Sequence, residues 1–166
     1  MSNGGILSGL KGIFAPEPDE HAATPAALAV DAGGFAAPAM VKPDTEWRAE
    51  LAPDQYRVLR EHGTERPGTS PLNGEKRAGV FDCAGCGTPV YTSETKYESG
   101  SGWPSFFAPI PGAVATTVDR SLGMIRTEVH CATCGGHLGH VFDDGPRPTG
   151  QRHCINGVAL TFAPQD

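Results

Sequence analysis

Two features are missing from this 166-residue sequence: a long apolar run and an excess of positive charge. A helix that spans a bilayer needs about 20 consecutive, mostly apolar residues, and no run here approaches that length. We therefore expect no stable membrane insertion. Lysine and arginine number 13 against 19 aspartates and glutamates, which gives a net charge of −6. This is the wrong sign for a protein held on a phosphate backbone, so nucleic acid is not an expected partner.

An export signal is also missing. The apolar patch near the N-terminus has one basic neighbour, Lys11, and is interrupted by glycine and serine, unlike a signal peptide. Residues 1–43 are half alanine, glycine and proline, which predicts a flexible tail; the patch either stays disordered or forms one amphipathic turn on a membrane or partner surface. Residues 44–166 then form a single domain. The expected location is the cytoplasm, where cysteines more often bind metals or catalyse than form disulfides.

After residue 43 the sequence has helical segments followed by short β-type runs. Residues 45–51 and 53–62 predict two short helices, the second opening with Pro53 and closing at Gly63. Apolar or threonine residues alternate with Arg126, Glu128 and His130, as in a half-buried antiparallel strand. Glycine and proline separate the runs, and the expected strands are residues 80–83, 89–92, 125–131, 137–142 and 154–162. These signals predict a mainly β domain with short N-terminal helices.

Four of the five cysteines form two C-x-x-C pairs, Cys83 with Cys86 and Cys131 with Cys134. Thiolates at this spacing can reach one tetrahedral ion, and two such pairs complete a shell of four thiolates. A disulfide or a redox dithiol is the alternative for either pair, but the repetition of the pattern favours one structural zinc per chain. A closed shell leaves no position for a substrate, so the chemistry must lie elsewhere.

The fifth cysteine, Cys154, is the candidate for that chemistry, although a lone cysteine is most often an inert buried side chain. On a strand over residues 154–162, Cys154 and Asn156 would share one face. His137 and His140 would point to opposite faces of a regular strand, but Gly139 between them could allow a bulge that brings both inward. Taken alone, either histidine is more often structural.

A glycine-rich loop over residues 100–106 contains Trp103. Glycines beside a tryptophan let the backbone and the indole approach a ligand, but a tryptophan in a protein of this size is usually part of the core. The residues by themselves therefore indicate a β domain with a structural zinc and a candidate thiol site framed by histidine, asparagine and tryptophan. They indicate no substrate.

Taken together, the motifs resemble the B-type methionine sulfoxide reductases. The resemblance runs from about Trp47 to Phe162 and includes both cysteine pairs, Leu51, Arg60, Thr64, Glu65, Lys96, residues 102–106, Asp119, Gly123, Met124, Arg126, and residues 137–142, 144–146, 149–150 and 152–156. It implies two antiparallel sheets around a shallow pocket, a fold of the β-tent type, with structural zinc at the far side. It also implies thiol-dependent reduction of methionine R-sulfoxide, free or in proteins, and repair of oxidised proteins. No organic cofactor is expected.

The resemblance assigns roles by matched position. Cys154 is the nucleophile, which becomes a sulfenic acid; His140, Asn156 and Trp103 line the pocket, with His137 beside them. The Trp103 indole would hold the methyl group on sulfur. His140, alone or together with His137 as a second catalytic histidine, would hydrogen-bond and protonate the sulfoxide oxygen. The loop also places Phe106 among the substrate-binding residues. Asp144 and Arg152 support the site from behind, or form only a structural salt bridge.

Two residues depart from the common pattern of that family. Ser101 stands where many members have a resolving cysteine, so an external thiol, thioredoxin, glutaredoxin or glutathione, is the expected reductant. His153 stands where Tyr or Phe commonly precedes the nucleophile, which adds a titratable group.

The expected assembly is a monomer. The alternative functions are a binding module on the same zinc-stapled scaffold, which would not need Cys154, and a zinc-ribbon nucleic-acid binder, which would need basic residues around the cysteine pairs.

Overall fold

The structure, a computed structural model, describes residues 37–166, so the tail predicted over residues 1–43 lies outside the described residues as far as residue 36. Two helices come first, α1 (Asp44–Glu50) and α2 (Pro53–Glu61), within one residue of their predicted positions. Pro53 opens α2, where its missing N–H costs nothing. The helix ends at His62, which has a left-handed backbone with φ of 56°. From residue 37 onward, no helix is long and apolar enough to cross a membrane.

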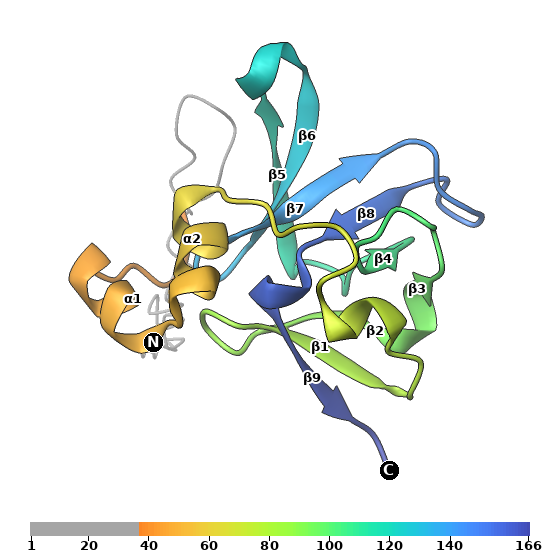
Figure 1. Ribbon diagram of the computed structural model, residues 1–166, viewed down its shortest axis with the longest axis horizontal. Coiled ribbons are helices and arrows are strands. Elements are labelled where there is room, and N and C mark those ends of the chain that lie inside the picture. Colours follow the sequence, from red (N-terminus) through yellow and green to blue (C-terminus); the bar gives the residue numbers. More distant parts are fainter. Residues whose placement is uncertain (1–36) are drawn as a thin grey trace, which may run out of the picture.

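Strands in the described range form two antiparallel sheets (Figure 1). The smaller sheet has the order β2-β1-β9, and the larger has the order β3-β4-β8-β7-β6-β5. The strand bounds are β1 (Gly79–Cys83), β2 (Pro89–Thr92), β3 (Lys96–Tyr97), β4 (Ser105–Phe106), β5 (Val114–Asp119), β6 (Arg126–Cys131), β7 (His137–Phe142), β8 (Arg152–Ile155) and β9 (Leu160–Pro164). Short 3-10 turns are η1 (Pro71–Gly74), η2 (Ser93–Thr95), η3 (Ser121–Gly123) and η4 (Gly157–Ala159). The predicted mainly β fold with two antiparallel sheets is confirmed.

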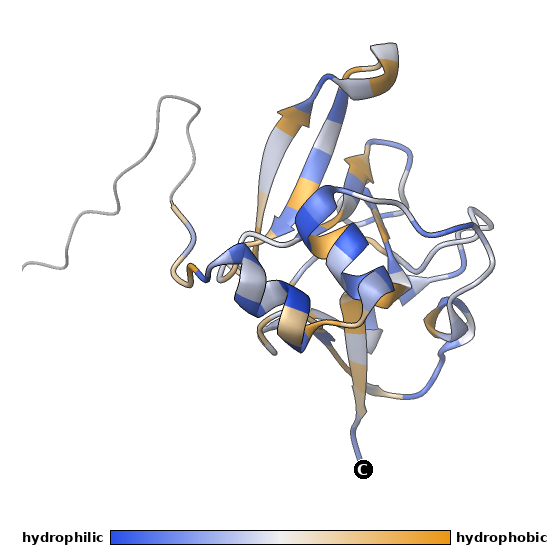
Figure 2. Cartoon of the chain, turned by 60° about the vertical axis from the view of Figure 1, so that its left-hand side comes forward, coloured by the Kyte–Doolittle hydropathy of each residue, from blue (hydrophilic) through white to orange (hydrophobic). Residues whose placement is uncertain are grey.

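Aromatic side chains join the two sheets in the core. Phe81 on β1 meets Phe106 on β4 edge-on, with ring centroids 5.1 Å apart, and Tyr91 on β2 stacks on Phe106 at 4.3 Å. All three are fully buried. Leu59 of α2 is buried as well, and α2 packs against β7 and η4. In Figure 2, hydrophobic and hydrophilic residues are interspersed along the helices that face the viewer, as expected for helices with one buried face.

The single strand predicted over residues 154–162 is wrong. The chain leaves the larger sheet after Ile155, turns through η4, and enters the smaller sheet as β9. The turn depends on partners distant in sequence: the Glu65 carboxylate accepts hydrogen bonds from the backbone N–H groups of Gly157 and Val158. A Cβ at Gly157 would lie 1.8 Å from the Ser70 hydroxyl oxygen, so only glycine fits. Period-two alternation describes a regular strand and does not reveal such a break.

The predicted irregularity near Gly139 is confirmed. Val129 pairs with Gly139 and His130 pairs with His137, so β7 has one residue more than β6 in this stretch. The extra residue brings the rings of His137 and His140 to a centroid distance of 5.4 Å. Gly139 also permits close strand approach, since a Cβ there would lie 2.0 Å from the Cys154 carbonyl oxygen.

Candidate functional site: a cysteine cluster and a thiol cavity

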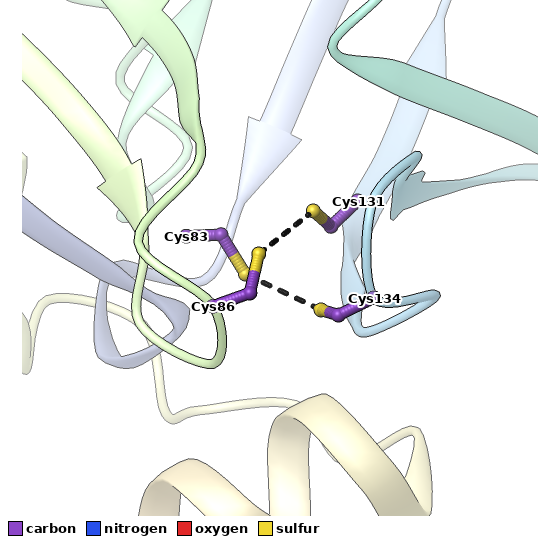
Figure 3. A group of neighbouring side chains, drawn as sticks. All are labelled: Cys83, Cys86, Cys131 and Cys134. Atoms are coloured by element: carbon purple, nitrogen blue, oxygen red, sulfur yellow. Dashed lines mark hydrogen bonds between the residues drawn. The ribbon is translucent and has the colours of Figure 1, made fainter. Parts of the chain in front are cut away.

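The two C-x-x-C pairs converge on one point (Figure 3). Cys83 Sγ lies 3.7 Å from Cys134 Sγ, and Cys86 Sγ lies 3.6 Å from Cys131 Sγ. These two contacts are longer than the S–S bond of about 2.05 Å, and all four cysteines are free thiols, so the disulfide alternative for either C-x-x-C pair does not hold. Zn–S bonds of about 2.3 Å place tetrahedral sulfurs about 3.8 Å apart. The cluster therefore suits a zinc ion bound by four thiolates.

Crowding makes these thiols unable to ionise together without a cation. Hydrogen bonding with Cys131 raises the pKa of Cys134, and the reciprocal hydrogen bond from Cys134 lowers the pKa of Cys131. A divalent ion bound by four thiolates would supply the missing positive charge, and its binding would release protons.

The fifth cysteine lines a separate cavity of about 110 Å³. Strand register places Cys154 on β8 directly opposite His140 on β7. The lining residues are Thr64, Trp103, Arg126, Gly139, His140, Phe142, Cys154 and Asn156. Four residues that the sequence analysis selected, Cys154, His140, Asn156 and Trp103, therefore meet around one space. A larger hollow of about 690 Å³ lies between α2, η1 and β9, but its lining contains no cysteine or histidine, so the smaller cavity is the candidate thiol site.

The Cys154 thiol is partly buried, and its surroundings act on its ionisation in opposite directions. Burial raises the pKa of Cys154, while the Ser101 hydroxyl, 4.0 Å from Sγ, and the nearby Arg152 guanidinium lower it. Arg152 is itself held by Asp144 at 2.8 Å. The balance leaves the pKa raised, so the resting side chain is a neutral thiol at neutral pH.

His140 is held by an acidic partner on the neighbouring hairpin. Its Nε2 lies 2.8 Å from Asp119 Oδ2, the oxygen that also accepts from Arg126 at 3.1 Å. Hydrogen bonds from the Ser121 backbone, together with these neighbours, lower the pKa of Asp119, so the carboxylate is ionised. Burial lowers the pKa of His140 despite that partner. The resting imidazole is therefore neutral, with Nε2–H donated to Asp119.

Glu65 connects the parts of the cavity wall, and local sequence reasoning gave it no role. Its backbone N–H donates to Asn156 Oδ1 at 2.9 Å, and its carbonyl accepts from Trp103 Nε1 at 3.1 Å. Its buried carboxylate holds the turn that follows Cys154, with Gly157 N at 2.6 Å and Val158 N at 3.1 Å. Only the matched Thr64–Glu65 pair pointed to this position. Its contacts with Asn156, Gly157 and Val158 span more than 90 residues of sequence, which periodicity cannot detect.

The remaining predicted site residues lie outside the cavity lining. Phe106 is fully buried in the aromatic core. His137 is 2% exposed, and its Nδ1 lies 2.6 Å from Glu128 Oε1. Asp144 and Arg152 form an ion pair at the surface, beside the ring of Phe142.

Comparison with known proteins identifies the family of this chain. The chain matches the model of the SelR domain over residues 51–164. "Peptide methionine sulfoxide reductase MsrB" of Pseudomonas putida (strain W619) is 60% identical over 122 residues, which is 73% of this chain and 92% of that protein. The protein of the same name from Agrobacterium fabrum is 54% identical over 128 residues, 76% of this chain and 95% of the relative. A solved Mis18 "Yippee-like" domain has a TM-score of only 0.45 at 18% identity, covering 54% of this chain and 99% of that one. The chain belongs to the SelR-domain family of peptide methionine sulfoxide reductases, the MsrB oxidoreductases.

Proposed function

We propose that this protein reduces the R epimer of methionine sulfoxide, free or within proteins, with Cys154 as the nucleophile. The observation that carries the proposal is the placement of Cys154 opposite His140 in a cavity walled by Trp103. The cavity is small, which suits a single sulfoxide group and its methyl rather than a large cofactor. Its partly buried thiol has the accessibility that a nucleophile needs.

The proton balance assigns a role to His140. The resting pair is a neutral thiol and a neutral imidazole, so the imidazole accepts the thiol proton as the Cys154 sulfur attacks the sulfoxide sulfur. It then passes that proton to the sulfoxide oxygen. The sulfur–oxygen bond of the substrate breaks, the oxygen transfers to Cys154 as a sulfenic acid, and methionine leaves. Asp119 stabilises the imidazolium that forms in between.

The other residues shape the cavity. Trp103 presents a fixed indole to the methyl group on sulfur, because its Nε1–H is already donated to Glu65. Both ends of the Asn156 amide are held by backbone groups, those of Glu65 and Leu138, so Asn156 acts as a positioning residue. Phe106 supports the site from within the core. His137 supports His140 from behind through ring contact.

Recycling requires a thiol from outside the chain. Cys83, Cys86, Cys131 and Cys134 are grouped in the metal cluster, and Ser101, at 4.0 Å from Cys154 Sγ, cannot form a disulfide. An external thiol, from thioredoxin, a glutaredoxin or glutathione, condenses with the sulfenic acid to a mixed disulfide and releases water. A second thiol then regenerates Cys154 and leaves as a disulfide. We infer a monomeric repair enzyme that acts in a reducing compartment such as the cytoplasm.

Zinc is the ion we propose for the cysteine cluster, with a structural role. Cys83 lies at the end of β1 in the smaller sheet, and Cys131 lies at the end of β6 in the larger one. Bound zinc would supply a cross-link between the two sheets. The cluster offers four protein ligands, which leaves no open position for a substrate.

Separate R and S epimers of a blocked methionine sulfoxide test the function. We expect the wild-type protein with dithiothreitol to convert the R epimer to the sulfide and to leave most of the S epimer. Cys154→Ser should abolish conversion without changing the fold or the metal content. Cys154→Ser protein that turns over the R epimer at a substantial rate would refute the assignment of the nucleophile.

A further inference from the structure

A second group of metal-binding side chains lies beside the thiol cavity and outside the cysteine cluster. His62 at the end of α2, Glu128 on β6 and His137 on β7 place one ligand atom each within 4.8 Å of the others. Both imidazole Nδ1 atoms lie 2.6 Å from the same oxygen, Glu128 Oε1. The end of α2 and two paired strands of the larger sheet therefore converge on one point.

The negative charge of the Glu128 carboxylate favours the binding of a cation at this point. The Glu128 side chain is 10% exposed. Burial opposes its ionisation, but hydrogen bonds from His137 and His62 and the nearby His130 lower the pKa of Glu128 to about 2. Within residues 37–166, its ion-pair partners are these three histidines, with no lysine or arginine among them. No lysine or arginine in this range therefore lies against the buried carboxylate, and a divalent ion would supply positive charge in addition to the imidazole hydrogen bonds.

The ligand set and its access fit a borderline metal ion. Two imidazole nitrogens and one carboxylate oxygen form the two-histidine, one-carboxylate set that binds zinc and other first-row divalent metals with positions left for water. Tetrahedral bonds of about 2.0–2.1 Å place two ligand atoms roughly 3.3 Å apart, so each imidazole nitrogen must move away from Glu128 Oε1 by roughly 0.7 Å. Glu128 and His137 are buried, whereas the His62 side chain is 62% exposed and has the most room to move. We propose that His62, Glu128 and His137 form a second divalent-metal site, selective for zinc-like ions and open to solvent through His62.

Metal at this site would act on the reductase reaction, a consequence that rests on the proposed function. The His137 ring meets the His140 ring edge-on with a centroid distance of 5.4 Å. A divalent charge on His137 disfavours the protonated form of His140, which must accept the thiol proton. The second ion is therefore inhibitory, and we expect zinc to slow turnover roughly tenfold or more.

The binding test uses the full chain with its cysteine cluster loaded. After equilibrium dialysis against micromolar free zinc, elemental analysis should find two zinc ions per wild-type chain and one per His62→Gly chain. Glycine suits the left-handed backbone at this position. Glu61→Gln, a change in the preceding exposed residue, is the matched control and should retain two ions. Cobalt added to protein that holds zinc only in its cysteine cluster should give the weak absorption bands of cobalt bound by nitrogen and oxygen, without intense thiolate charge-transfer absorption.

A single zinc in the wild-type protein, a second zinc that persists in His62→Gly, or thiolate bands from the added cobalt would each overturn the site. Inhibition is tested in single turnovers of pre-reduced protein, without a chelating thiol. Added zinc should slow the wild-type protein and Glu61→Gln but not His62→Gly. Equal inhibition of His62→Gly would show that zinc acts at Cys154 instead. Metal counts do not depend on turnover, so failure of the metal site and failure of the proposed reaction are distinguishable.

Discussion

Replacing Glu65 by glutamine tests whether one buried carboxylate holds the thiol cavity together. The glutamine side chain keeps the size and shape of glutamate, but one carboxylate oxygen becomes an NH₂ group. That group would face a backbone N–H, either Gly157 N, now 2.6 Å from Oε1, or Val158 N, now 3.1 Å from Oε2. One hydrogen bond is lost, a donor meets a donor, and the remaining bond loses its charge assistance.

The magnitude follows from these two contacts. A hydrogen bond to a charged group contributes about 1.5–3 kcal/mol, and an unsatisfied buried donor costs about 1–3 kcal/mol. We expect Glu65→Gln to lower the free energy of unfolding by about 2–4 kcal/mol, a large share of the roughly 5–15 kcal/mol of a typical domain. In urea the unfolding midpoint should fall by roughly 1–2 M.

Activity should fall as well, because the turn held by Glu65 directly follows the strand that carries Cys154. The loss should appear in kcat at a temperature where the variant is still folded. Glu94→Gln, at an exposed position, is the matched control and should change stability by less than about 0.5 kcal/mol. A Glu65→Gln protein as stable and active as that control would refute the role of the carboxylate as an anchor.

Three further predictions concern charge and metal. Arg152→Met should shift the pH dependence of Cys154 alkylation to higher pH, because the guanidinium lowers the pKa of Cys154. Asp144→Asn should shift it to lower pH, because the carboxylate raises that pKa. A shift in the same direction for both variants would contradict these assignments. Burial lowers the pKa of His153 to about 4, whereas the pKa in the unfolded chain is about 6.5. Between these pH values the unfolded chain binds more protons than the folded one, so the free energy of unfolding falls by up to about 3 kcal/mol as the pH falls through that window. In urea titrations, His153→Phe should reduce the difference in the free energy of unfolding between pH 5 and pH 7. An unchanged difference would mean that other groups cause the loss of stability in acid. Cys131→Ser should lose the zinc and lower the melting temperature severely; metal loss at an unchanged melting temperature would remove the structural role.

The sequence predicted the longer strands and the ligand pairs because their signals are local. Residues 126–131 and 137–142 form the expected strands, and the spacing within each C-x-x-C pair is enough to group its sulfurs. β3 and β4 have two residues each, too few to show a period in the sequence. β4 forms because β8 offers it a partner edge, and β3 pairs with β4 in turn. The break after Ile155 likewise depends on a carboxylate about 90 residues away.

The same difference between local signals and long-range contacts separates the site residues that were predicted from those that were not. Cys154 and His140 were expected together from matched motifs, and strand register places them opposite each other. Asp119 as the partner of His140 was not predicted, because the contact requires β5 and β7 to flank β6. Glu128 belonged to a predicted alternation as an outward residue, yet it is buried among histidines. The sequence offered one signal for this: Glu128 lies on a strand that ends at Cys131, one of the predicted zinc ligands.

The most direct test of the account is the fate of the oxygen atom in one turnover without reductant. Zinc-loaded protein is treated with one equivalent of methionine R-sulfoxide, and its intact mass is measured under conditions that retain the metal. A mechanism with Cys154 as the only reacting cysteine predicts one added oxygen, or an adduct of a sulfenic-acid trap at Cys154. A loss of two hydrogens with release of zinc would contradict it, because a cysteine of the metal cluster would then be the resolving thiol.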